Sequence, residues 1–186
     1  TGHGFGPALS ATQLQAMLRV SFRLGAGLDE ACQQVNNQLA EDLPDDRFIT
    51  AFLGFLDPDN HRLEYHSAGQ GPILHFRAAE MQCDFYKPTS FPMGVMSMSE
   101  APQGQTIEMQ PGDVLGLISD GIYEYNGADG SQFGEARVAQ IVRDHHHQSM
   151  DELSQALVAA AQEFGGDEPQ ADDITLAMVR RLPGSD

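Results

Sequence analysis

The sequence predicts an α+β fold, an antiparallel β-sandwich flanked by helices. Near both ends of the 186-residue chain, apolar residues recur at three- and four-residue spacing, which is typical of amphipathic helices. Between these segments, and once more close to the C-terminus, the period changes to two, which is typical of strands. The order is two helices, a run of strands, two helices and a final strand. Sheets packed face to face with helices outside are the layered arrangement that this order favours.

Two helices open the predicted fold. Pro7 can occupy a first helical turn, and the apolar spacing continues over residues 14–24 up to a break at Gly25. The same spacing over residues 28–39 predicts a second helix.

The middle of the chain is predicted to be strands. Asp57-Pro58-Asp59-Asn60 is a turn signal between the first two strands, and the first three are expected to form a meander. Gln110-Pro111-Gly112-Asp113 is expected to join the strands on either side of it into a hairpin. The predicted strands are 48–56, 62–67, 73–76, 81–86, 105–109, 114–118 and 174–179.

Two further helices precede the last strand. Residues 134–144 form one, and Ser149 with Glu152 gives the capping-box signal for another, which ends at Gly165-Gly166. Three consecutive histidines, His145-His146-His147, follow the first of these helices. Because neighbouring residues on a helix point in different directions, we expect a solvated helix end there and no metal site.

The charge and composition of the chain exclude several classes of function. The formal net charge is −17 at pH 7, whereas binding to nucleic acid or to an anionic membrane depends on Lys and Arg. No apolar stretch approaches the ~18 residues of a membrane span, and no signal-peptide pattern is present. The two cysteines, Cys32 and Cys83, give no disulfide framework. We therefore expect a cytoplasmic protein without a nucleic-acid or membrane partner.

Two short acidic motifs lie at the ends of buried-strand patterns. Ser119-Asp120-Gly121 follows the apolar run 114–118, and Asp172-Asp173 precedes the apolar run 174–179. If these two strands are antiparallel neighbours, the carboxylates of Asp120 and Asp172 converge at one end of a sheet. Hard oxygen ligands grouped in this way suit Mg²⁺ or Mn²⁺, whereas Zn²⁺ more usually binds Cys or spaced His.

Each acidic motif also has a plain structural explanation. Asp-Gly is a common turn dipeptide, and Asp172-Asp173 could equally be a solvated strand start. The methionines at 93, 96 and 98 suggest a soft-metal site, but no His or Cys accompanies them at ligand spacing. Packing is the favoured interpretation of these methionines, because Met commonly fills irregular apolar gaps.

Several segments match one family pattern in the same order along the chain. They are Thr1-Gly2-His3-Gly4 with Pro7-Ala8, Phe48-Ile49-Thr50-Ala51, Ser67-Ala68-Gly69-Gln70, Phe91-Pro92-Met93-Gly94-Val95, Pro111-Gly112-Asp113, Ser119-Asp120-Gly121 and Ala171-Asp172-Asp173-Ile174-Thr175. From Thr1 to about Val179 the chain resembles the metal-dependent serine/threonine phosphatases of the PPM/PP2C type. The resemblance is to their bacterial branch, which includes stage II sporulation protein E and the phosphatases that act on anti-sigma-factor antagonists.

The resemblance implies both a fold and a chemistry. The fold is the antiparallel sandwich with outer helices, and a pair of Mn²⁺ or Mg²⁺ ions would activate water to hydrolyse phosphoserine or phosphothreonine. Asp120 and Asp172 match terminal ligands of one ion. In this resemblance Asp173 orients the site through hydrogen bonds, and glycines keep the loops tight. The residues implied to support the site without binding metal are Gly2, His3, Gly4, Gly121 and Asp173.

The chain departs from the family pattern at two places. Gln70 stands where the family usually has His. The metal-bridging aspartate of the family lies two positions before the residue that matches Thr1, and a further metal-site aspartate lies upstream of that. We therefore expect residues 1–186 to be a single phosphatase domain that lacks its N-terminal strands, binds one ion or none, and has little activity alone. By the same resemblance, a sensory or receiver domain would precede it.

The resemblance also implies a partner, and two other classes of function stay open. The partner is a phosphorylated anti-sigma-factor antagonist or a similar regulatory protein, and a homodimer is allowed. Gln70 and the absent ligands favour a catalytically inactive pseudophosphatase that only binds a partner protein. Asp120 and Asp172 oppose that alternative, because a decayed site has no physical reason to keep carboxylates together. The third class is a metal-dependent phosphohydrolase of a small molecule.

Overall fold

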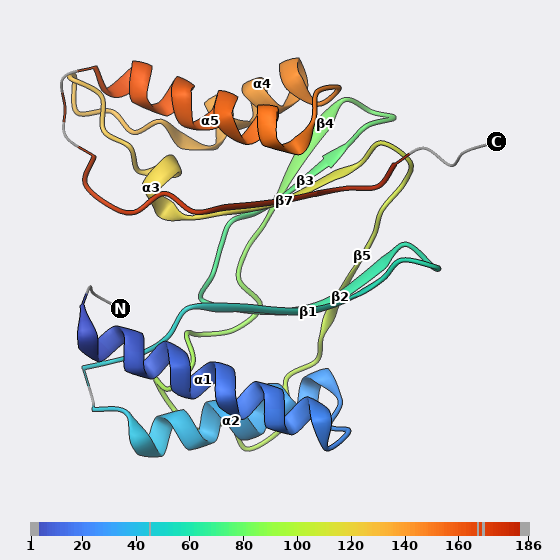
Figure 1. Cartoon of the computed structure of the whole chain (residues 1–186), viewed down its shortest axis with the longest axis vertical. Coiled ribbons are helices and arrows are strands. Elements are labelled where there is room, and N and C mark those ends of the chain that lie inside the picture. Colours follow the sequence, from blue (N-terminus) through green and yellow to red (C-terminus); the bar gives the residue numbers. More distant parts are fainter. Residues whose placement is uncertain (1–3, 45, 167, 169, 183–186) are drawn as a thin grey trace. The chain divides into compact units, whose positions relative to one another are not determined.

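The computed structural model describes residues 4–44, 46–166, 168 and 170–182. The chain consists of two compact units. Unit 1 comprises Thr1–Gln70 and Pro88–Glu108, and unit 2 comprises Gly71–Lys87 and Met109–Asp186. Each unit contains helices and one antiparallel sheet, and Figure 1 shows both.

Unit 1 joins two helices to a three-stranded sheet in the order β1-β2-β5. The apolar face of α2 buries Cys32, Val35 and Leu39 together with Ala68 and Met93. Complete burial of a Val or Leu side chain contributes about 1.5–3 kcal/mol, so this face is what fixes α2 on the sheet. The elements are α1 (Phe5–Arg23), α2 (Leu28–Asp42), β1 (Ala51–Asp57), β2 (Arg62–Ala68) and β5 (Gln105–Glu108).

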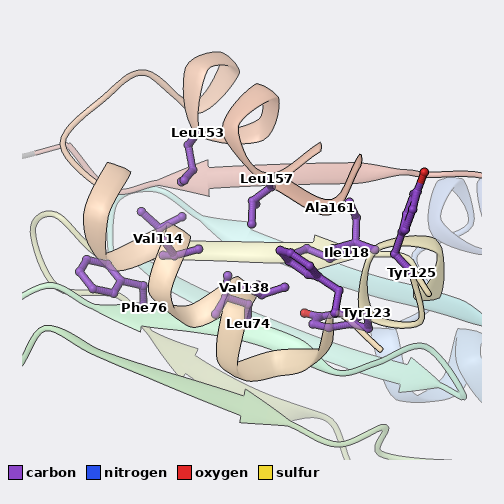
Figure 2. Packing of buried hydrophobic residues seen from close by; sticks show 13 residues of the cluster. Leu74, Phe76, Val114, Ile118, Tyr123, Tyr125, Val138, Leu153, Leu157 and Ala161 are labelled. Carbon is purple, nitrogen blue, oxygen red and sulfur yellow. The ribbon is translucent and has the colours of Figure 1, made fainter. Parts of the chain in front are cut away.

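Unit 2 has a four-stranded antiparallel sheet in the order β4-β3-β6-β7. In Figure 2, Leu153 and Leu157 of α5 and Val138 of α4 point toward Leu74 and Ile118 of the sheet, and all five side chains are fully buried. The elements are β3 (Ile73–Arg77), β4 (Gln82–Tyr86), β6 (Val114–Ile118), α3 (Asp120–Tyr123), α4 (Gly134–His145), α5 (Met150–Gly165) and β7 (Leu176–Arg180).

Helix α5 begins where its capping signal predicts. The Ser149 side chain accepts a hydrogen bond from the Glu152 backbone N–H, and the Glu152 carboxylate accepts one from the Ser149 backbone N–H. The helix ends before Gly166, whose φ of 60° lies in the left-handed region that favours glycine. The capping box predicted at the start of the helix and the predicted end at Gly165-Gly166 are both confirmed.

The predicted strand segments exist, but two of their pairings were wrong. β1 and β2 form the expected hairpin, yet β3 leaves the meander and pairs with β4 and β6. The expected hairpin between residues 105–109 and 114–118 does not form, because β5 pairs with β2 while β6 pairs with β3 and β7. A period of two sets which face of a strand is buried, but it does not select the neighbouring strand.

Residues 110–113 form a turn, closed by the bond from the Asp113 N–H to the Gln110 carbonyl at 3.0 Å, although the strands on either side do not pair. Asp113 also holds this turn to other parts of unit 2. Its carboxylate accepts hydrogen bonds from the backbone N–H groups of Gln110 (2.8 Å) and Ala78 (2.8 Å). Its backbone carbonyl accepts from the N–H of Arg181 at 3.0 Å. The turn is therefore tied to the ends of β3 and β7, within unit 2, and not to a partner strand of its own.

The predicted fold class is confirmed as a mixed helical and antiparallel-sheet fold with two sheets. Among the described residues, no helix is both long enough and apolar enough to cross a membrane.

Candidate metal-binding site

The two acidic motifs meet because β6 and β7 are antiparallel neighbours, which is the condition that the sequence analysis set for their convergence. Ile118, the last residue of β6, pairs with Leu176, the first residue of β7. The chain therefore leaves β6 at Ser119-Asp120 beside the segment 172–175 that leads into β7. This register brings Asp120 and Asp172 to the same end of the sheet of unit 2.

Ser119 connects the two segments directly. Its backbone N–H donates to the Thr175 carbonyl at 2.9 Å. Its hydroxyl donates to the Asp173 carbonyl at 3.1 Å and accepts from the Thr175 backbone N–H at 2.9 Å. Three hydrogen bonds from one residue therefore hold the start of the β7 segment against the end of β6.

Asp120 and Asp172 are both exposed, and a neighbouring backbone N–H orients each carboxylate. Asp120 is the first residue of α3, and its Oδ1 accepts from the Gly121 N–H at 3.1 Å. Asp172 Oδ1 accepts from the Asp173 N–H at 2.7 Å. The Asp172 carbonyl also accepts from the Gln170 side-chain amide at 2.8 Å. The contact from Asp173 is the kind of hydrogen bond expected of a site-supporting residue.

Gly121 is the point of closest approach between the two segments. A Cβ atom added there would lie 3.0 Å from the carbonyl carbon of Asp173 and 3.3 Å from the carbonyl oxygen of Asp172. Real Cβ atoms rarely come so close to backbone atoms, so only glycine lets the chain after Asp120 pass against residues 172 and 173. That Gly121 supports a metal site stays a prediction.

A cavity of about 190 Å³ lies beside the carboxylates. Sequence reasoning missed three of its polar residues, Glu124, Asn126 and Gln132. The spacing of Glu124, four residues after Asp120 and thus about one helical turn away, was a signal that could have identified it. The residues that line the cavity are Asp120, Gly121, Glu124, Tyr125, Asn126, Gln132, Ala171 and Asp172.

The donor atoms around this cavity fit a hard divalent cation. They are carboxylate, amide and backbone oxygens, and neither Cys nor His lines the cavity, which is the ligand chemistry of Mg²⁺ or Mn²⁺. Within the described ranges, no group of three or more His, Cys, Asp or Glu residues is placed to hold a metal ion. Asp120 and Asp172 could therefore hold an ion only together with water, substrate or further ligands.

Three of the implied supporting residues belong to the N-terminal segment. Gly2 and His3 lie outside the described residues. Gly4 precedes α1 in unit 1 with a φ of 98°, a conformation that favours glycine, and so agrees with the expectation of a tight loop.

The histidine run is less solvated than predicted. His146 is half-buried, its ring lies 5.0 Å from that of Phe76, and its Nδ1 is 2.8 Å from the Arg143 carbonyl. Arg180 donates to the His146 carbonyl at 3.0 Å, which ties the helix end to β7. His147 is exposed as expected. The expectation of a wholly solvated helix end is therefore corrected, because His146 packs on the edge of the core.

The predicted packing role of the methionines holds in part. Met93 is fully buried in the α2 cluster, whereas Met96 is 55% exposed. The backbone of this loop is held by two side chains of α2, since Asn36 donates to the Met96 carbonyl at 2.9 Å and Asn37 to the Met98 carbonyl at 2.9 Å. Met96 was therefore wrongly expected to pack.

Two contacts between a buried histidine and an aspartate were not predicted. His75 Nε2 lies 3.2 Å from Asp113 Oδ2 in unit 2. His66 Nε2 lies 2.7 Å from Asp29 Oδ1 in unit 1. Both imidazoles are almost fully buried, and each links elements far apart in sequence. Only tertiary structure creates these pairs, so no local motif could have indicated them.

The thiols are unreactive groups, as predicted. Burial raises the pKa of Cys32 to about 11 and that of Cys83 to about 11. Both therefore stay protonated at neutral pH and supply no nucleophile.

Comparison with solved structures shows the same fold in known phosphatase domains. The SiaA PP2C domain of Pseudomonas aeruginosa is 23% identical, with a TM-score of 0.81 over 97% of this chain and 72% of that one. The RsbU and RsbW domains of a Mycobacterium tuberculosis protein are 25% identical, with a TM-score of 0.78 over 100% of this chain and 51% of that one.

A third structure is the PP2C phosphatase domain and a fragment of the regulatory domain of the cell fate determinant SpoIIE from Bacillus subtilis. It is 17% identical, with a TM-score of 0.77 over 97% of this chain and 52% of that one. The chain thus spans about half the length of the second and third structures. A search of curated proteins gave no match.

Comparison with protein families matches residues 1–182 to stage II sporulation protein E. The match covers nearly the whole chain and includes both acidic motifs. The chain belongs to the stage II sporulation protein E (SpoIIE) family, and its fold is that of PP2C phosphatase domains.

Proposed function

We propose that this domain is the catalytic part of a metal-dependent protein serine/threonine phosphatase. Its substrate would be phosphoserine or phosphothreonine on a regulatory protein, such as an anti-sigma-factor antagonist. The observation that carries the proposal is the antiparallel register of β6 and β7, which brings Asp120 and Asp172 to one cavity. The family assignment supports the same reaction.

Asp120 and Asp172 are the residues that would hold Mn²⁺ or Mg²⁺. A divalent ion bound there would acidify a water molecule and neutralise charge on the phosphoryl oxygens. The N–H groups of Gly121 and Asp173 fix one oxygen of each carboxylate and so limit the directions in which the carboxylates can bind. Gly121 lets both segments approach the same point.

The proposal for a protein substrate has support from the relatives. One solved relative includes a fragment of a regulatory domain beside its phosphatase domain, and another joins RsbU and RsbW domains in one protein. We propose that this domain likewise acts under a regulatory domain, in the cytoplasm, on a partner protein.

The test is phosphate release from a phosphoserine protein, measured with the protein including any sequence that precedes Thr1. We expect release to require Mn²⁺ or Mg²⁺, to stop with a chelator, and to fall at least a hundredfold in Asp120→Asn. Asp144→Asn is the control, because Asp144 is exposed on α4, away from the cavity, and its carboxylate accepts hydrogen bonds from the Gln140 side chain. Equal loss in both variants would contradict a specific role for Asp120.

The same assay separates phosphatase from pseudophosphatase. Gln70 stands where the family usually has His, and this difference is the observation that favours the pseudophosphatase. A protein that binds the phosphoprotein but releases no phosphate under any metal condition would support a regulatory binding domain. Release from small phosphate esters but from no phosphoprotein would support a small-molecule phosphohydrolase.

A further inference from the structure

We infer that Ser119 is a positioning residue for the metal-binding carboxylates: its hydroxyl sets the spacing between Asp120 and Asp172. The inference rests on the proposed function, because it assumes that these two carboxylates bind a divalent cation. It concerns a side chain that neither binds metal itself nor contacts substrate in this proposal.

Ser119 occupies a helix N-cap position, where a serine side chain would ordinarily cap the helix. It is the N-cap residue of α3, with an extended backbone (φ −73°, ψ 160°). A serine at this position usually accepts a hydrogen bond from a backbone N–H in the first helical turn. Here the side chain makes no such cap bond. The hydroxyl instead forms its hydrogen bonds with the segment that leads into β7.

The hydroxyl bridges two backbone groups of that segment. It accepts from the Thr175 N–H at 2.9 Å and donates to the Asp173 carbonyl at 3.1 Å. The regular pairing of β6 with β7 begins only at Ile118 and Leu176. Residues 173–175 precede this pairing, and three hydrogen bonds of Ser119 attach them to the end of β6, two of which involve the hydroxyl.

This attachment acts on the carboxylates themselves. Asp120 follows Ser119 in the chain, and Asp172 precedes Asp173. The Asp173 carbonyl is held by the Ser119 hydroxyl on one side and packed against Gly121 on the other. Metal–ligand distances are tolerated within about 0.2 Å, so a small shift of Asp173 that carries Asp172 with it would disturb coordination.

The test compares two serines at helix N-caps of the same unit. Ser119→Ala removes the bridge at the site, whereas Ser149→Ala removes the capping hydroxyl of α5, outside the proposed site. Mn²⁺ affinity is measured by titration calorimetry on the metal-free protein including any sequence that precedes Thr1, because residues 1–186 alone are expected to bind one ion or none. The melting temperature of the same metal-free protein is measured alongside. We expect Ser119→Ala to weaken Mn²⁺ binding by about tenfold or more, the range found when groups that orient metal ligands are removed.

Ser149→Ala is the control variant, and Ser119→Thr is the rescue variant. Ser149→Ala is expected to lower the melting temperature while leaving the Kd for Mn²⁺ within twofold of the wild type. Ser119→Thr, which keeps the hydroxyl, is expected to restore most of the Mn²⁺ affinity. If Ser119→Ala fails to fold, Ser119→Cys replaces it, because a thiol donates and accepts hydrogen bonds only weakly.

Failure of the inference and failure of the proposed function give different results. Mn²⁺ binding that is strong in the wild type and equal in Ser119→Ala overturns the positioning role and leaves the metal site intact. Absence of Mn²⁺ binding in the wild type overturns both. Hydrogen exchange of the Thr175 amide gives a readout without metal: Ser119→Ala should exchange faster there than the wild type and Ser149→Ala should not, and equal exchange overturns the bridge itself.

Discussion

Gly121 lies against the backbone of Asp173 so closely that there is no room for a side chain between them. A Cβ atom at position 121 would be 3.0 Å from the carbonyl carbon of Asp173. The obstacle is backbone, which cannot move aside as the end of a flexible side chain can. The contact therefore fixes how near the residue after Asp120 comes to the residue after Asp172.

Replacing Gly121 by alanine is expected to destabilise the protein by about 1–3 kcal/mol, the usual cost of overpacking a tight contact. Because the added methyl group pushes residues 172 and 173 away, Mn²⁺ affinity should fall as well. Urea unfolding and Mn²⁺ titration measure the two effects. Gly27→Ala is the control, since nothing lies within 4 Å of a Cβ there and its φ is −69°. Similar effects from both variants would show that the crowding at Gly121 is unimportant.

Mn²⁺ is expected to raise the melting temperature of the protein that includes any sequence preceding Thr1, by binding at Asp120 and Asp172. A ligand that binds only the folded state stabilises it by mass action, by about 2.7 kcal/mol at a free concentration of 100 times Kd. Asp120→Asn and Asp172→Asn should each remove most of this shift, as measured by thermal unfolding with and without Mn²⁺. Asp144→Asn should keep it. An unchanged response in both site variants would place the metal elsewhere.

Asp113→Ala is expected to destabilise unit 2 by about 3–5 kcal/mol, the cost of leaving the partners of a buried charged group unpaired. The carboxylate accepts from two backbone N–H groups and faces the buried His75 at 3.2 Å. Asp57→Ala is the matched comparison. Asp57 Oδ1 also accepts from two backbone N–H groups, those of Asp59 and Asn60, but the turn is exposed. The free energy of unfolding of both variants is measured by urea unfolding. If Asp113→Ala loses no more stability than Asp57→Ala, the role of burial is contradicted.

Stability is expected to depend on pH through the capping box of α5. Hydrogen bonds from the backbone N–H and then the hydroxyl of Ser149 lower the pKa of Glu152 below its ordinary value of 4.5. Because the folded-state pKa is the lower one, this contribution is complete well above pH 4.5 and is lost as the pH falls through the folded-state value. The stability difference between wild type and Glu152→Gln should therefore shrink on acidification.

Urea unfolding at pH 7 and at successively lower pH values measures that difference. Glu163→Gln controls for the loss of one charge from the same helix, since Glu163 is exposed and takes no part in the cap. A difference that stays constant from pH 7 down to pH 3 would show that the ionised Glu152 carboxylate does not stabilise the cap.

Local signals in the sequence were sufficient for α1, α2, α4 and α5 and for the positions of the acidic motifs, but not for the short helix α3. Ser149 and Glu152 lie three residues apart, so their reciprocal hydrogen bonds form within one helical turn and need no distant partner. Asp120 and Asp172 could be placed at strand ends because an apolar run marks a buried strand by itself. The convergence of the two aspartates was predicted only on the condition that their strands are neighbours.

Tertiary structure decided which strands are neighbours, and therefore which residues surround the site. The segments 105–109 and 114–118 looked like a hairpin, because alternation records the buried face of a strand and carries no information about its partner. The bond of Asp113 to Ala78, the bridge from Ser119 to Asp173 and Thr175, and the meeting of Asp120 and Asp172 at one cavity all depend on that choice of partner. Such contacts join residues far apart in the chain, so they come into existence only when the sheet has formed.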